Sequence, residues 1–124
     1  MAAGLFQPVA NTFIVWGETS PLLGVLATGP TNGPLMAYRM RNVDTDQAWI
    51  AYGATPAAAQ AAATLPSDSA IGSGGLTAKS AAFCMPIGGG QEVTVMAPPG
   101  QYWSAVTQQG GARVQITPGF QSNP

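Results

Sequence analysis

The last third of the chain, residues 82–119, constrains the fold more than any other stretch. Short apolar runs alternate there with turn sequences rich in glycine and proline. The runs are residues 82–87, 91–97, 102–108 and 112–119, and the turns are residues 88–90, 98–100, 110–111 and 118–119. Turn signals at such short intervals are typical of an antiparallel β-sandwich or barrel. We expect Pro118 to end the last strand, because proline cannot donate a ladder hydrogen bond.

The upstream sequence continues this strand pattern. Further strands are predicted at residues 12–16, 22–28, 35–43 and 47–52. In the third of these, Met36, Tyr38 and Met40 alternate with Arg39 and Arg41, which predicts one buried and one exposed face. The expected fold is therefore all-β: an antiparallel sandwich of jelly-roll or immunoglobulin-like type, with about seven to eight strands.

Residues 55–63 admit two interpretations. Thr55 as N-cap, Pro56 at the first position and a run of alanines favour a short helix. The segment is, however, shorter than Ala-rich helices that are stable alone, and small side chains also suit an extended strand. Helix and strand both stay open for residues 56–63. A long polar loop is predicted at residues 65–79.

A length of 124 residues suits one domain with its own core. We divide it into an amino-terminal arm at residues 1–11, a β-sandwich at residues 12–119 and a short tail at residues 120–124. Arms of this kind often contact neighbouring subunits. Met1 to Gly4 lacks the basic start and apolar centre of a signal peptide, so we expect synthesis in the cytoplasm.

Charged residues are unusually scarce. They make up 7% of the chain, where about 25% is typical of soluble domains. The formal net charge of -1 provides little repulsion between molecules. A surface largely covered by protein partners explains this composition, and an uncharged polar surface of Thr, Gln, Ser and Asn is the alternative.

The sequence offers little for catalysis, and we expect no enzymatic activity, metal or cofactor. It has no histidine, so acid-base work would fall to five carboxylates: Glu18, Asp44, Asp46, Asp68 and Glu92. Asp44 and Asp46 lie in a predicted turn, where aspartate commonly bonds the backbone. Their other interpretations are a catalytic pair or a weak Ca²⁺ site. Cys84, the only cysteine, is expected to be a small buried hydrophobe.

Nucleic acid and membrane are not expected partners. The basic residues are Arg39, Arg41, Lys79 and Arg113, too few for a phosphate-binding patch. No apolar stretch approaches the length that spans a bilayer.

The aromatic residues suggest a rival class. A β-sandwich with exposed rings can stack on sugars, so a carbohydrate-binding module for host glycan attachment is the alternative. The other interpretation is that the rings fill the core or an interface. The residues concerned are Trp16, Trp49, Trp103, Tyr38, Tyr52 and Tyr102. Apolar residues on both faces of the strands that hold Trp49 and Trp103 favour a subunit contact on an outer face.

The order of strands and turns from Leu35 to Gly119 resembles that of small β-sandwich virion proteins of tailed bacteriophages. The segments that carry the resemblance are residues 38–43, 48–53, 85–89, 92–93, 98–107 and 113–119. It implies a capsid decoration or cement subunit, or another head-associated, neck or tail component. The partners would be further copies of the chain, in a trimer, together with the major capsid protein or other virion proteins. Localisation would be the capsid surface of the virion. The predicted contact residues are Phe6, Met36, Met40, Trp49 and Trp103.

Overall fold

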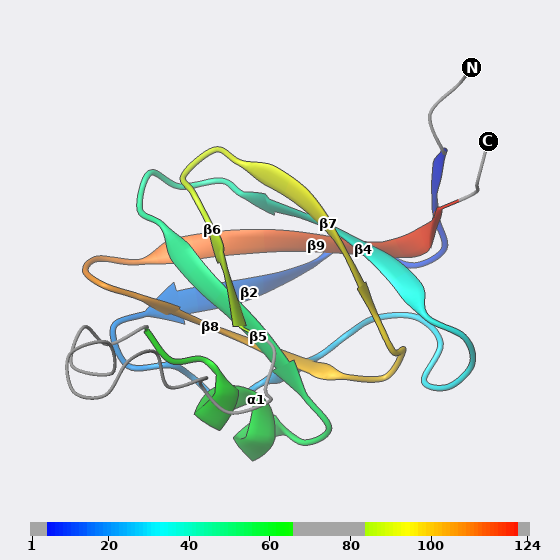
Figure 1. The fold of residues 1–124 in the computed structure, drawn as a ribbon, viewed down its shortest axis with the longest axis horizontal. Coiled ribbons are helices and arrows are strands. Elements are labelled where there is room, and N and C mark those ends of the chain that lie inside the picture. Colours follow the sequence, from blue (N-terminus) through cyan, green and yellow to red (C-terminus); the bar gives the residue numbers. More distant parts are fainter. Residues whose placement is uncertain (1–4, 66–83, 122–124) are drawn as a thin grey trace, which may run out of the picture.

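The computed structural model describes residues 5–65 and 84–121 and is built almost entirely of β-strands (Figure 1). Its one described helix is α1 (Pro56–Ala62). The strands are β1 (Phe6–Pro8), β2 (Phe13–Glu18), β3 (Val25–Leu26), β4 (Met36–Asn42), β5 (Ala48–Gly53), β6 (Cys84–Ile87), β7 (Glu92–Ala97), β8 (Tyr102–Thr107) and β9 (Ala112–Gln121). The expected all-β class with one short helix is confirmed.

These strands form one continuous sheet that curls until it nearly closes into a barrel. Its order is β6-β5-β8-β2-β9-β4-β7, with β1 paired to β9 and β3 paired to β8. The two edge strands are β6 and β7, which follow each other in the sequence and diverge from the turn that joins them (Figure 1). The sheet differs from a purely antiparallel one in a single pairing, because β2 and β8 run parallel. These two strands are far apart in the sequence, so the chain between them can cross over as a parallel pair requires.

The inside of the curled sheet holds the main core. Trp103 on β8 is fully buried, and the rings of Tyr38 and Tyr52 lie 5.2 and 5.0 Å from it, centroid to centroid. The alternation predicted for β4 and β9 is confirmed: Met36, Tyr38, Met40, Val114 and Ile116 are buried, while Arg39, Arg41, Arg113 and Gln115 are exposed.

Helix α1 settles the ambiguity at residues 56–63 in favour of a helix. The side-chain oxygen of Thr55 accepts a hydrogen bond from the backbone N–H of Ala58 at 3.0 Å, and Pro56 occupies the first turn. Tertiary packing supplies the stability that a helix of this length lacks alone. Ala62 joins Ala51 of β5 and Val106 of β8 in a second, smaller core. Strands β5 and β8 are therefore apolar on both faces because α1 covers the outer one, not because a subunit does.

Strand β9 does not end at Pro118, contrary to expectation, but continues to Gln121. The Pro118 carbonyl accepts a hydrogen bond from the N–H of Val9, and the N–H and C=O of one strand residue point to the same side. An N–H at position 118 would therefore point toward the irregular link between β1 and β2 and not toward β4. A proline is tolerated there because no ladder bond is lost.

The amino-terminal arm folds back on its own chain. Strand β1 pairs with the end of β9, Phe6 opposite Gln121 and Pro8 opposite Gly119. The two strands stand together at one corner of the molecule (Figure 1). The arm at residues 1–11 and the tail at residues 120–124 are thus partly joined, and residues 1–4 and 122–124 lie outside the described residues.

Three other expectations are only partly met or lie partly outside the described residues. The predicted loop at residues 65–79 is described only at Leu65. The predicted strand at residues 22–28 shrinks to β3, Val25–Leu26. Cys84 is half-buried, not fully buried, and its thiol donates to the Thr64 carbonyl at 3.4 Å.

Candidate functional site

For three of the five predicted contact residues, the prediction of a surface position is wrong. Met36 is 1% exposed, and Met40 and Trp103 are 0% exposed. Their strands present them to the inside of the curled sheet, where they form the main core. A buried side chain cannot meet a partner unless the fold opens, so these residues act in stability.

The other two predicted contact residues reach the surface. Phe6 is half-buried: its ring lies where a side chain on Gly119 would be, and the Arg39 guanidinium carbon lies 4.6 Å from the ring centroid. Trp49 is half-buried beside the smaller core. The structure does not bring Phe6 and Trp49 together, because they belong to β1 and β5 at separate places in the strand order.

Large apolar side chains that the sequence analysis did not select are exposed instead. On β2, Ile14 is 45% and Trp16 is 53% exposed, while Phe13 and Val15 point inward. Apolar residues at successive positions of 13–16 were a usable signal that both faces of this strand are apolar. The remaining exposed large apolar residues of the described chain are Leu5, Val9, Leu22, Leu23, Val25, Leu26, Leu35, Met96 and Phe120.

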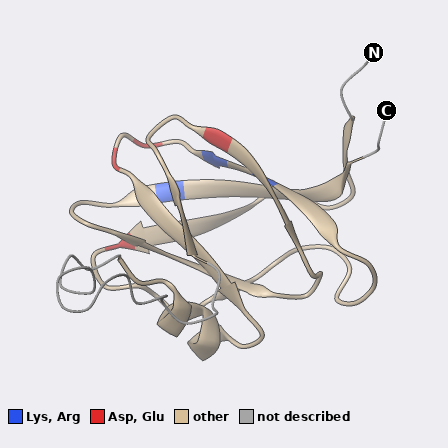
Figure 2. Cartoon of the chain, in the orientation of Figure 1, with Lys and Arg blue, Asp and Glu red and all other residues tan. Residues whose placement is uncertain are grey.

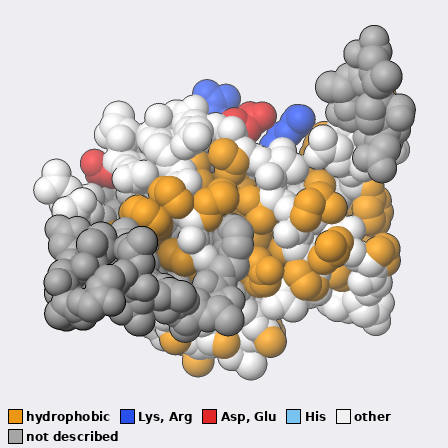
Figure 3. Space-filling model, in the orientation of Figure 1, with side chains coloured by type: hydrophobic (Ala, Val, Ile, Leu, Met, Phe, Trp, Pro, Cys, Tyr) orange, Lys and Arg blue, Asp and Glu red, His pale blue; other side chains and the backbone are white. Residues whose placement is uncertain are grey.

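Another face of the molecule is also apolar in part. Figure 3 shows hydrophobic side chains gathered on the side that carries β6 and β7, with charged side chains confined to its upper edge. Met85 on β6 and Val93 on β7 are partly buried against the main core at this side. The open seam of the sheet is thus lined by apolar groups.

Six of the seven described charged residues lie on β4, β7 and β9 or in the turn after β4, and the seventh, Glu18, lies at the end of β2 (Figure 2). Arg39 lies 3.6 Å from Glu92 in an exposed ion pair. Arg113 lies opposite Trp16 in the β2–β9 register, with its guanidinium carbon 5.8 Å from the ring centroid. We define the Trp16 face as Ile14, Trp16 and Arg113, which lie on the outer side of two paired strands.

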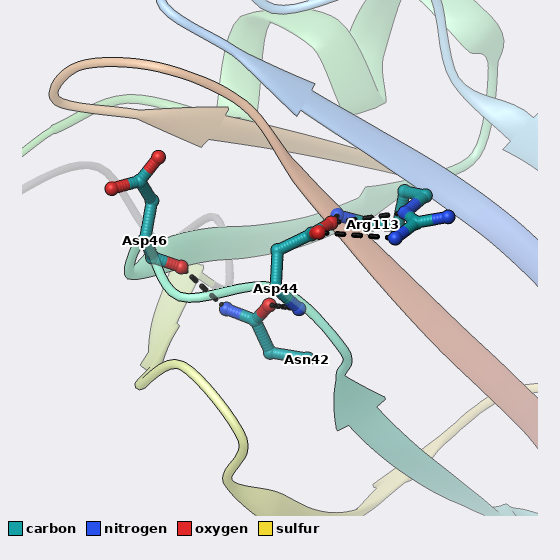
Figure 4. Close-up of polar contacts among 4 residues, drawn as sticks. All are labelled: Asn42, Asp44, Asp46 and Arg113. Carbon is teal, nitrogen blue, oxygen red and sulfur yellow. Dashed lines mark hydrogen bonds and ion pairs between the residues drawn. The ribbon is translucent and has the colours of Figure 1, made fainter.

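Asp44 fixes Arg113 in place. Its carboxylate accepts hydrogen bonds from the Arg113 side chain at 3.0 and 3.1 Å and from the Arg113 backbone N–H at 2.7 Å (Figure 4). The side-chain bond, followed by the backbone bond, lowers the pKa of Asp44 below its ordinary value. The same pairing raises the pKa of Arg113. The pair orients the guanidinium that borders Trp16.

Asn42 is fully buried, and its side chain anchors the turn after β4 by hydrogen bonds. Its side-chain amide donates to the carbonyls of Asp46 at 2.7 Å and Ile87 at 3.0 Å, and its oxygen accepts from the N–H of Asp44. The expected turn at residues 44–46 is confirmed, with Asn42 as an anchor that the sequence analysis missed. Asp44 and Asp46 do not converge: the Asp46 carboxylate points away from the other three residues (Figure 4).

The Asp44–Arg113 pair predicts an acid-dependent loss of stability. The pKa of Asp44 is lower in the folded than in the unfolded state, so its contribution is complete above the unfolded pKa, about 3.9, and is lost as pH falls through the folded pKa. We expect Asp44→Asn to be less stable than the wild type at neutral pH, with the difference shrinking near pH 2. Urea unfolding at both pH values measures this.

The matched control is Asp46→Asn. Among residues 5–65 and 84–121, no hydrogen bond or ion pair engages the Asp46 carboxylate, so this substitution should lower the free energy of unfolding at neutral pH less than Asp44→Asn does. Equal pH profiles for Asp44→Asn and the wild type would contradict the assigned role of the pair.

Other chemistry finds little support in the described geometry. Within the described ranges, no three His, Cys, Asp or Glu side chains gather as metal ligands would. No helix in that part of the chain is long and apolar enough to cross a membrane. Of the rings considered for glycan binding, Tyr38, Tyr52 and Trp103 pack against one another at tilted angles in or beside the main core and so are not part of an exposed row.

Comparison of the chain with protein-family models, with curated proteins and with solved structures finds no match.

Proposed function

We propose that the chain is a non-enzymatic structural protein that acts by binding other proteins, and that it is a decoration or cement subunit on the capsid of a tailed bacteriophage. The observation that carries the binding role is the combination of many exposed large apolar side chains with very few charges. Contiguous exposed apolar surface marks protein-protein contacts, and Ile14 and Trp16 are exposed on the same face of β2. The resemblance of residues 35–119 to small virion proteins supports the capsid as the location.

We place the contact between copies in the proposed trimer at the Trp16 face. Tryptophan and arginine are the residue types that most often dominate binding energy at interfaces, and here Trp16 and Arg113 lie side by side on paired strands. Both side chains are on a rigid sheet, and Asp44 orients the guanidinium. Little conformational entropy remains to be lost on association.

The trimer is tested by size-exclusion chromatography with light scattering. The wild type should have the mass of three chains, and the double variant Ile14→Lys, Trp16→Ala should shift toward monomer. Loss of one interface hot spot costs about 2 kcal/mol or more, which corresponds to roughly 30-fold weaker association. The matched control is Thr94→Lys, an exposed position on β7. A wild type that is monomeric at all concentrations contradicts self-association.

The capsid location is tested on purified particles. Imaging with an antibody or a fused tag should place the chain over the head shell, and particles without it should lose their contents at a lower temperature. A protein that binds only the assembled lattice stabilises it by mass action. Label at the neck or tail would move the assignment to those structures, and absence from the particle would end the virion proposal.

A further inference from the structure

A polar recess of about 320 Å³ lies between the turn that follows β4 and the turn that joins β8 to β9. Small-molecule sites in proteins occupy roughly 300–1,000 Å³. The residues that line the recess are Thr45, Asp46, Gln47, Trp49, Gln108 and Gln109. None of them belongs to the Trp16 face.

Both walls of the recess are fixed by buried or partly buried hydrogen bonds. Asn42 holds the Asp46 carbonyl at 2.7 Å. The Thr107 hydroxyl donates to the Gly110 carbonyl at 2.9 Å, which fixes the opposite turn. Gly110 has a φ of 73°, and the Asp46 carboxylate occupies the space that a side chain there would need. Only glycine suits both constraints. The walls are therefore preorganised.

The lining restricts the chemistry of a ligand. It contains no basic residue, so it does not suit a phosphate or another anion. It contains one carboxylate, too few for a divalent cation, which prefers several oxygen ligands. Three glutamine amides can each donate and accept, and the Asp46 carboxylate makes no hydrogen bond or ion pair with the described residues. An uncharged ligand with many hydroxyl groups fits this set.

We propose that the recess binds a neutral saccharide. The apolar C–H face of a sugar ring packs on the Trp49 indole, and its hydroxyls donate to the Asp46 carboxylate and exchange hydrogen bonds with the Gln108 and Gln109 amides. Most small-molecule sites are lined mainly by apolar side chains. Here one aromatic ring stands among five polar residues, which suits a ligand covered with hydroxyl groups. This inference does not depend on the structural role, because a monomer outside any particle would bind sugar in the same way.

The proposal is tested by titrating isotopically labelled protein with glucose, galactose, N-acetylglucosamine, maltose and lactose while recording the indole N–H resonances. At least one sugar should shift the Trp49 resonance in a saturable way and leave that of Trp16 unchanged. Asp46→Ala and Gln108→Ala each remove a hydrogen-bonding partner, and a bond to a charged group contributes about 1.5–3 kcal/mol. Binding should therefore weaken by roughly 10-fold or more in Asp46→Ala. The matched control is Gln115→Ala, on the outer face of β9.

Three outcomes would overturn the assignment. The first is that no sugar shifts the Trp49 resonance up to the solubility of the probe. The second is that Asp46→Ala and Gln108→Ala bind sugar as the wild type does. The third is that calcium chloride or sodium phosphate alone produces the saturable shift, which would make the recess an ion site. None of these results depends on whether the chain forms trimers.

Discussion

Trp103→Ala should be the most destabilising single substitution in the described chain, lowering the free energy of unfolding by about 3–5 kcal/mol. Trp103 is 0% exposed and lies against the rings of Tyr38 and Tyr52. Truncation removes its buried apolar area and leaves a cavity, because the strands around it cannot collapse fully. Urea unfolding followed by circular dichroism measures the loss.

Two matched variants separate cavity formation from a general sensitivity to substitution. Trp103→Phe keeps one ring between Tyr38 and Tyr52 and should be less damaging than Trp103→Ala. Leu35→Ala removes a large apolar side chain that is 57% exposed, and should change stability by no more than about 0.5 kcal/mol. Equal losses for Trp103→Ala and Leu35→Ala would show that Trp103 does not lie in the core.

Asn42→Ala should also lower the free energy of unfolding strongly, by about 2–4 kcal/mol. The Asn42 side chain is buried and serves two carbonyls and one N–H, on Asp46, Ile87 and Asp44. Each group left without a partner away from water costs about 1–3 kcal/mol, partly offset where water enters. The turn after β4 should loosen with it, and the recess lined by Asp46 should lose its shape.

Hydrogen exchange and unfolding together test this role. Faster amide exchange at residues 43–47 and beside Ile87 is expected in Asn42→Ala, with little change in the strands near α1. The control is Gln91→Ala, an exposed amide that accepts a hydrogen bond from the N–H of Gly88 at 2.7 Å. A loss in Asn42→Ala no larger than that in Gln91→Ala would refute the anchoring role.

Local pattern predicted much of this fold. Alternation along β4 and β9 predicted which side chains are buried, since a pleated strand sends successive residues to opposite faces. The capping sequence Thr55-Pro56 contained the signal for α1. The turn at residues 44–46 was predicted from its aspartates, although the side chain that accepts a hydrogen bond from the turn backbone is that of Asn42.

The local pattern could not predict which apolar face of a strand is buried in the core and which stays exposed. Trp16 and Trp103 both sit in strands with apolar residues on two faces, yet Trp16 is exposed and Trp103 is enclosed. The difference is set by how the sheet curls: Trp103 lies on the inner face of β8, packed against Tyr38 and Tyr52, whereas Trp16 lies on the outer face of β2, which no described element covers. The parallel pairing of β2 with β8 is likewise a matter of tertiary arrangement. The contact residues Met36, Met40 and Trp103 were wrong for this reason.

The recess escaped prediction for a related cause. Asp46 and Gln108 are far apart in the sequence, and only the antiparallel pairing of β5 with β8, Ala48 opposite Thr107, brings their turns together. No residue spacing along the chain predicts that these two turns lie side by side.

The pairing of Phe6 with Gln121 has a consequence for larger assemblies. Polypeptide joined ahead of β1 and polypeptide joined behind β9 would leave the domain from a single corner (Figure 1). The domain could therefore be inserted into a surface loop of another protein without forcing the two ends of that loop apart. A protein fused to either terminus would lie at the same corner of the domain.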